Sequence, residues 1–230
     1  VRDVNVNQAI TATRGSFVSN AGRDVNVKAV ITTTNGDVVL RADNDGTGPG
    51  VAGGTVVFTG GSVTMNNGAA SIYYNPSSYA APTNYLGNFN LTGSTLTSFM
   101  WLFVNNSSAT AQNKTYDGTT AATLNTPFTF LNGPDGVTAG QRVSLSAGAA
   151  AFNSKDVATA TTVAFTGYGL GSADAGLYSL SSQPASQTAA ITPKALTMSG
   201  LSVPASKIYD GTTTAVVSGG PGTLAAAEAP

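Results

Sequence analysis

The acidic residues best spaced to bind a metal ion are Asp43 and Asp45, in the stretch Asp43-Asn44-Asp45-Gly46-Thr47-Gly48. Alternating oxygen ligands followed by a glycine for the bend are typical of calcium loops. The stretch lacks the terminal glutamate of an EF-hand, which excludes that motif. Asp43 and Asp45 are therefore candidate calcium ligands, with a solvated turn as the alternative, and we expect no other cofactor.

A second group of reactive side chains lies in a Tyr-Asp-Gly motif that occurs twice. Tyr116-Asp117-Gly118 lies in the heptapeptide KTYDGTT, and Tyr209-Asp210-Gly211 lies 93 positions later in KIYDGTT. A tyrosine beside a carboxylate could bind a sugar. A structural turn is the stronger interpretation, because glycine adopts positive φ, aspartate accepts bonds from nearby backbone N–H groups and tyrosine can bury its ring.

The side-chain inventory excludes several kinds of catalysis. The chain has no Cys and no His, so imidazole-based triads and Cys/His zinc sites cannot form. The Arg-Asp pairs at 2–3 and 23–24 resemble the charged clusters of calcium-dependent polysaccharide lyases, but ion pairing between repeats explains them as well. Because no acid–base pair in a cleft can be argued, we expect no enzymatic activity.

Composition indicates the fold class and limits the partners. The net charge is −1 and basic residues do not cluster, which argues against nucleic-acid binding. Only 9% of residues are charged. The chain is rich in strand and turn formers and poor in helix formers, so it is predicted to be all-β. Residues 1–20 lack a signal peptide and no apolar run is long enough to cross a membrane, so we expect an interior fragment of a longer protein.

Residues 2–22 and 23–43 are two copies of one sequence. At an offset of 21 they share 11 identities, too many to follow from composition. A third copy follows at an offset of 32, which aligns Val63, Thr64, Gly68 and Ile72 with residues of the second. The extra 11 residues are assigned to an insertion at 44–54, and a fourth, weaker copy to residues 76–97.

Each copy contains short segments in which apolar residues alternate with polar ones, so their apolar side chains should point inward from strands. A repeat of about 21 residues suits three strands and three corners, with successive copies stacked as parallel strands. Asn5 would lie over Asn26, and Thr11 over Thr32. Residues 1–105 are therefore predicted to form a parallel β-helix, right-handed by the usual rule for parallel crossovers.

The most apolar stretch of the chain is 98–104, which includes Phe99, Trp101 and Phe103. Directly after the last repeat, it would cap the open end of the stack or join it to the next module. A contact surface for a partner or for a second copy of the chain is the alternative.

The two Tyr-Asp-Gly motifs mark two further modules. In residues 106–192 strands are predicted at 119–124, 141–147, 160–166, 176–181 and 187–192, separated by turn-forming residues. This pattern predicts a small β-sandwich, with a β-grasp-like arrangement as the alternative. Residues 193–230 contain the second motif and only the start of a second module, which pairs either with its own neighbour or with another copy.

These features together resemble the filamentous haemagglutinin family of two-partner-secretion adhesins. The repeats resemble the β-helical shaft of that family, and SFMWLFVNNSS followed by KTYDGTTAAT resembles its junction to YDG domains. Three later stretches also have counterparts there: 152–159, 171–180 and 191–197. The resemblance implies a long surface protein of a Gram-negative bacterium, exported through a partner pore in the outer membrane.

The expected function is that of a non-enzymatic adhesin segment, a rod-like stalk that carries modules away from the cell. Its expected partners are a receptor or glycan on a host or neighbouring cell and the outer-membrane secretion partner. A self-assembling extracellular fibre or matrix subunit is the first alternative. A calcium-dependent polysaccharide-active β-helix enzyme is the second.

Overall fold

The structure is a computed structural model that describes residues 3–44, 54–76, 82–131, 143–195 and 200–219. In this part the chain is nearly all β, which confirms the predicted class, with two 3-10 helices, η1 (Leu86–Asn88) and η2 (Ala175–Leu177), and no α-helix. No helix described is long and apolar enough to cross a membrane.

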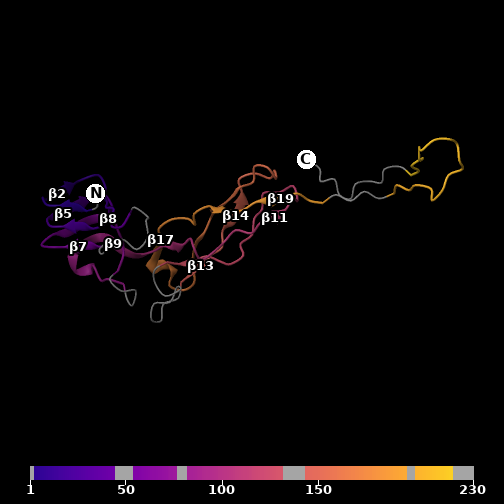
Figure 1. Cartoon of the computed structure of the whole chain (residues 1–230). Helices are drawn as coiled ribbons and strands as arrows, with labels where there is room; N and C mark the ends of the chain where they lie inside the picture. Colours follow the sequence, from indigo (N-terminus) through magenta and orange to yellow (C-terminus); the bar gives the residue numbers. More distant parts are fainter. Residues whose placement is uncertain (1–2, 45–53, 77–81, 132–142, 196–199, 220–230) are drawn as a thin grey trace. The chain divides into compact units, whose positions relative to one another are not determined.

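The chain, drawn whole in Figure 1, divides into two compact units. The first comprises Val1–Thr110, Leu124–Ala149 and Phe165–Ala185, and the second comprises Ala111–Thr123, Ala150–Ala164 and Ser186–Pro230.

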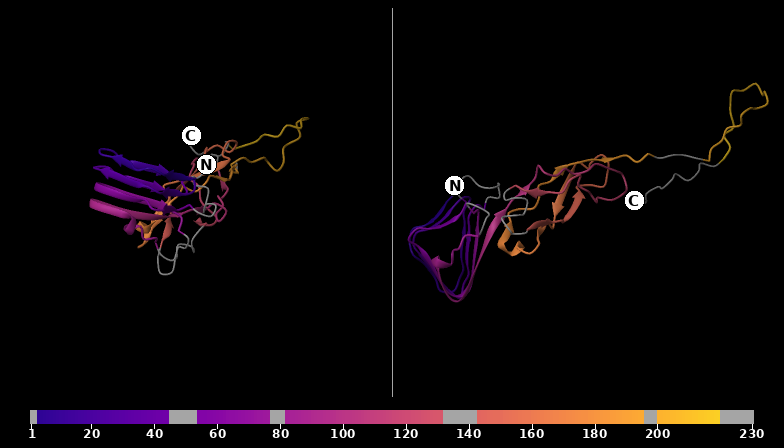
Figure 2. Two further views of the ribbon diagram at one scale, coloured as in Figure 1. Left: turned by 90° about the vertical axis from the view of Figure 1, so that its left-hand side faces the viewer. Right: turned by 90° about the horizontal axis from the view of Figure 1, so that it is seen from below.

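The first unit begins with parallel strands that follow the sequence repeat. The first two copies contribute three strands each, and Figure 2 shows them as stacked, similarly bent layers. The pairs run in the orders β1-β4-β7, β2-β5-β8-β9 and β3-β6-β8. The bounds are β1 (Val4–Val6), β2 (Ile10–Ala12), β3 (Phe17–Asn20), β4 (Val25–Val27), β5 (Val30–Thr34), β6 (Val38–Arg41), β7 (Val56–Phe58), β8 (Ser62–Tyr74) and β9 (Phe89–Leu102).

The strand register confirms the offsets read from the sequence. Asn5 pairs with Asn26, and Thr11 with Thr32, at an offset of 21. Thr32 then pairs with Thr64 at an offset of 32. The insertion therefore leaves the stacking of the third copy on the second undisturbed.

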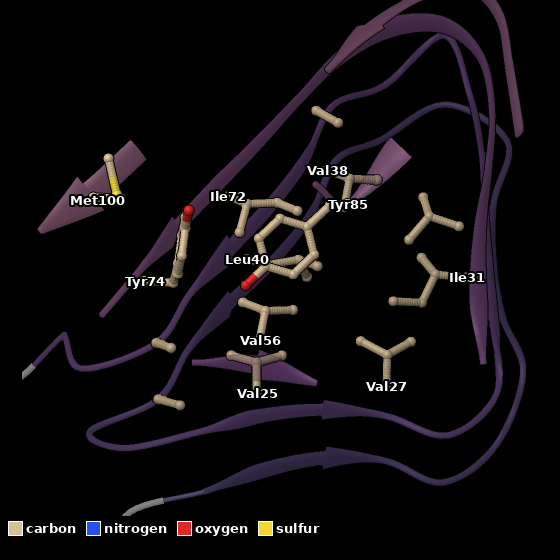
Figure 3. Close-up of a cluster of buried hydrophobic side chains, with 14 of the residues drawn as sticks. Val25, Val27, Ile31, Val38, Leu40, Val56, Ile72, Tyr74, Tyr85 and Met100 are labelled. Atoms are coloured by element: carbon tan, nitrogen blue, oxygen red, sulfur yellow. The ribbon is translucent and has the colours of Figure 1, made fainter. Parts of the chain in front are cut away.

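The core of this stack is built by the inward half of each alternating segment. In β4 and β6 buried residues alternate with partly exposed ones. Figure 3 shows the buried side chains pointing into the space between the strand layers. Burying one such aliphatic side chain stabilises the fold by about 1.5–3 kcal/mol. The fully buried members include Val25, Val27, Ile31, Val38, Leu40, Val63 and Ile72.

One corner of the stack requires a left-handed backbone in successive copies. Asn35, Asn67 and Gly93 have φ angles of 54°, 57° and 59°. Asparagine and glycine are the residues that best tolerate this conformation. A Cβ atom added to Gly36 or to Gly68 would overlap the backbone of the copy before it. Close backbone stacking thus explains the glycines at 36 and 68.

The apolar stretch 98–104 lies inside the fold. Met100, Trp101, Leu102 and Phe103 are all buried. Strand β17 (Tyr178–Leu180) pairs in parallel with the end of β9 over Met100–Leu102, so a strand from later in the chain continues the stack.

The first unit also contains two short antiparallel pairs. Strand β10 (Val104–Asn105) pairs with β12 (Thr129–Phe130), and β13 (Ser144–Ser146) pairs with β16 (Gly169–Gly171).

Two sheets account for the second unit. Strand β11 (Lys114–Thr115) pairs in parallel with β19 (Ile191–Thr192). Strands β14 (Ala149–Phe152), β15 (Thr162–Thr166) and β18 (Gln187–Thr188) form a three-stranded sheet in that order.

Most strands predicted in this region are present in shorter form. The segments 141–147, 160–166 and 176–181 contain β13, β15 and β17, and 187–192 divides into β18 and β19. The prediction for 119–124 is wrong, because this segment forms isolated bridges at Ala121, which pairs with Ala151, and at Leu124, but no strand. The Ala122 N–H donates to the Ala150 carbonyl, whereas the Thr123 carbonyl accepts the Gln112 N–H, so the segment changes partner after Ala122 and neither pairing extends into a ladder.

Candidate functional site

The first Tyr-Asp-Gly motif forms a closed hydrogen-bond network around the Asp117 carboxylate. Asp117 Oδ1 accepts bonds from the Thr119 backbone N–H and hydroxyl, both at 2.9 Å, and from Lys114 Nζ at 2.8 Å. Lys114 Nζ also donates to the Thr119 carbonyl at 2.8 Å. Gly118 has φ 79°, a conformation that favours glycine.

The network changes the acidity of Asp117. The Lys114 ammonium, followed by the Thr119 donors, lowers the pKa of Asp117 to about 2. The carboxylate is thus held ionised and is engaged by its own turn. Such a group favours a structural task over proton transfer near neutral pH.

The second motif repeats the bonds around the carboxylate, although Lys207 Nζ donates to the Thr214 carbonyl, at 2.9 Å, where Lys114 Nζ binds that of Thr119. Lys207 Nζ lies 2.8 Å from Asp210 Oδ1, which also accepts the Thr212 N–H at 3.0 Å, and Gly211 has φ 80°. Here too the lysine lowers the pKa of Asp210. The local geometry therefore arises from the heptapeptide itself.

The tyrosines of the two motifs differ in environment. Tyr116 is half-buried, in agreement with a ring packed on its module. Tyr209 is 92% exposed, whereas a buried ring is expected from the sequence. The difference has a physical reason, because the strand before Tyr116 is paired to β19, and around Tyr209 the described chain forms only the bridge between Ser202 and Ser218.

Of the two candidate calcium ligands, Asp43 is described and Asp45 lies outside the described residues. Asp43 is buried, has φ 50° and accepts a hydrogen bond from the Asn75 side-chain amide. In the described part of the chain no three His, Cys, Asp or Glu residues lie close enough together to hold a metal ion. Calcium binding stays a prediction, and titration calorimetry with calcium tests it.

The other acidic residues of the repeats make local contacts. Arg23 Nε donates to Asp3 Oδ1 at 2.7 Å, which lowers the pKa of Asp3 and raises that of Arg23. Asp24 Oδ1 accepts the backbone N–H groups of Gly54 and Thr55 at 2.7 and 3.0 Å. The Arg-Asp cluster thus links neighbouring copies and secures the chain where the insertion ends.

The three candidate interface residues pack against their own chain. Phe99 stacks on Tyr73 with ring centroids 4.9 Å apart, and the Arg41 guanidinium lies 4.8 Å from the centroid of Tyr73. The Trp101 indole N–H donates to the Ala42 carbonyl at 2.7 Å. Phe103 is 2% exposed.

Two tyrosines near the end of the stack lie in its core. Tyr74 and Tyr85 meet edge to face inside the stack, with ring centroids 5.2 Å apart (Figure 3). Burial raises the pKa of Tyr85 to about 12.

A cavity of about 290 Å³ in the first unit was not foreseen from the sequence. The Tyr168 ring lines it together with Phe128, and these two rings meet edge to face at 5.8 Å. The Gln183 amide binds both the N–H and the carbonyl of Tyr168, at 2.8 and 2.9 Å. The turn-forming residues at 167–169 draw attention to Tyr168. Nothing in the sequence spacing predicts its contact with Gln183, which lies 15 residues away. The remaining lining residues are Leu124, Asn125, Thr126, Pro127, Leu145 and Ala147.

Comparison with known proteins assigns one part of the chain. No curated protein and no solved structure matches the chain. Residues 103–187, which contain the first Tyr-Asp-Gly motif and the Tyr168 cavity, match the model of the YDG domain.

Proposed function

We propose that this chain is a non-enzymatic segment of a secreted bacterial surface adhesin, in which it acts as a stalk. The observation that carries the proposal is the parallel pairing of successive repeats in one register, continued by β17 of the YDG domain. Each copy contacts mainly its neighbours, so added copies would lengthen such a segment by a fixed increment. A receptor or glycan on a host or neighbouring cell is the proposed partner of the whole adhesin.

The finer fold belongs to the same proposal. The repeats would form a right-handed parallel β-helix and residues 106–192 a β-sandwich-like or β-grasp-like YDG module. The YDG match and the resemblance of the repeats to a shaft support membership of the filamentous haemagglutinin family. Membership would imply export through an outer-membrane partner of a Gram-negative bacterium and display at the cell surface.

Surface labelling tests this proposal. An antibody raised against the 230-residue chain should label intact bacteria that produce the parent protein as strongly as permeabilised ones. Labelling confined to permeabilised cells would overturn the surface assignment. Release of reducing ends from polysaccharides by the purified chain, dependent on calcium and lost on deletion of 44–54, would instead support the enzyme alternative.

A self-assembling fibre or matrix subunit is a second candidate, favoured by exposed apolar side chains near the second motif. Ile208, Tyr209 and Val216 are 92%, 92% and 72% exposed. Filaments that grow with concentration in negative-stain microscopy, and that disappear in the Ile208→Ser variant, would favour the fibre. A monomer at every concentration would favour the stalk.

A further inference from the structure

Two parallel strand pairs join strands of the YDG domain, residues 103–187, to strands just outside it, and each pairs a strand upstream in the chain with one downstream. In the first unit Met100–Leu102 of β9 pair with Tyr178–Leu180 of β17. In the second unit Lys114 and Thr115 of β11 pair with Ile191 and Thr192 of β19. Strands that are neighbours in sequence can pair as an antiparallel hairpin, whereas parallel strands need a long connection between them. Both of these pairs are parallel and join strands far apart in the chain.

The second pair is secured by bonds beyond its short ladder. The Lys114 N–H donates to the Ala190 carbonyl at 3.1 Å, and the Tyr116 N–H to the Thr192 carbonyl at 2.8 Å. Two side chains cross the pair as well. The Asn113 Oδ1 atom accepts the Ala190 N–H at 2.8 Å, and the Thr192 hydroxyl donates to the Lys114 carbonyl at 3.2 Å.

Each pair is also anchored by burial. Ile191 is 2% exposed and Tyr178 is 4% exposed. The Ser181 N–H extends the first pair by a bond of 2.9 Å to the Leu102 carbonyl.

The direction of the strands decides how such a pair responds to a pull on the chain. Tension draws the upstream strand toward its own beginning and the downstream strand toward its own end. Because the strands are parallel, they must slide past each other, and all bonds of the pair bear the load together. In an antiparallel pair the same pull would open the bonds one after another from one end.

We propose that the YDG domain, together with the adjoining strands β9 and β19, is a tension-bearing element whose pairs β9/β17 and β11/β19 act as clamps loaded in shear. In this arrangement the Tyr-Asp-Gly turn has a mechanical role. It directly follows β11, and its Asp117 and Thr119 hold the Lys114 side chain of that strand. The turn thereby fixes the upstream strand of the second clamp.

Single-molecule force spectroscopy on the full chain tests the clamp by changing only the direction of the pull. The sequence has no cysteine, so two can be introduced as handles. Gln112→Cys with Ala195→Cys pulls β11 and β19 from opposite ends and loads them in shear. Gln112→Cys with Ala190→Cys pulls from the end where both strands begin and peels them apart.

The proposal expects a clearly higher unfolding force in the shear geometry, and equal forces in the two geometries would overturn it. In the shear geometry Thr192→Val should raise the rate of unfolding at constant force roughly five- to tenfold, the effect of one hydrogen bond. The matched control Thr188→Val, whose side chain makes no hydrogen bond in the described part of the chain, should leave that rate unchanged. An equal effect of both variants would count against the proposal.

That the domain bears tension on the cell rests on the proposed stalk function. The resistance of the clamp to force is measured on the purified chain. Failure of surface labelling would remove the stalk and leave the force difference intact. Equal forces together with surface labelling would remove the clamp alone.

Discussion

Gly36 lies against Gly15 at the corner between the first two repeats, so closely that a Cβ atom on Gly36 would overlap the Gly15 carbonyl group. Gly15 itself has open space where its own Cβ would lie. The two positions match in the sequence repeat but differ in their surroundings, because only Gly36 has a preceding copy in the described chain.

This relationship predicts opposite outcomes for the same substitution. Gly36→Ala should lower the free energy of unfolding by roughly 1–3 kcal/mol, the usual cost of overpacking. Gly15→Ala should leave stability unchanged or slightly raised, because alanine restricts the unfolded chain. Urea denaturation of both variants checks this, and equal losses would contradict the stacking geometry.

The carboxylate of Asp117 predicts acid sensitivity. Its folded pKa of about 2 lies below the ordinary value of 3.8. The stability that its ionised form contributes is therefore present above about pH 4 and is lost as the pH falls toward 2. Asp117→Asn should remove this part of the pH dependence, whereas Asp156→Asn should retain it. NMR titration of the side-chain carboxyl in the folded protein should give the low pKa directly.

Asp24 is predicted to stabilise the chain after the insertion. Asp24→Ala leaves the Gly54 and Thr55 N–H groups without this acceptor, which should cost about 1–3 kcal/mol in the free energy of unfolding. Amide exchange at 54 and 55 should accelerate at the same time. Asp156→Ala is the control, because among the described side chains that carboxylate contacts only the exposed Lys155, at 3.1 Å. Unchanged exchange in Asp24→Ala would refute the assignment.

Tyr178 is predicted to hold the last strand on the stack. Tyr178→Ala removes a ring that is 4% exposed and should cost roughly 3–5 kcal/mol, as for other large aromatic residues. Hydrogen exchange should report faster exchange at 100–102 and 178–181 than in the unchanged protein. Tyr178→Phe keeps the ring and should therefore lose much less stability than Tyr178→Ala.

The sequence predicts the strand register of the repeats well, because each copy pairs with the copy before it at the offset that the sequence identities give. The identities at Asn5/Asn26 and the offset of 32 at Thr64 translate directly into strand pairs. The turn around Asp117 is equally accessible to prediction, since its bonds span at most five residues.

Contacts between distant segments are where prediction from this sequence fails. The pairing of Tyr178 with Met100 joins residues 78 positions apart, and neither segment carries a pattern that names the other. The Gln183 support of Tyr168 is a side-chain contact of the same kind. The segment 119–124 looks like a strand from its β-forming residues, yet it forms only isolated bridges, at Ala121 and Leu124.

The closure of the insertion has a practical consequence. Its two ends meet, because a Cβ atom built on Gly54 would lie 3.0 Å from the Cβ of Asp43. Doubling the length of a loop between fixed ends costs only about 0.6 kcal/mol in closure entropy. This corner is thus a natural grafting point, where an epitope tag or a reporter peptide could replace the insertion while the neighbouring repeats keep their register.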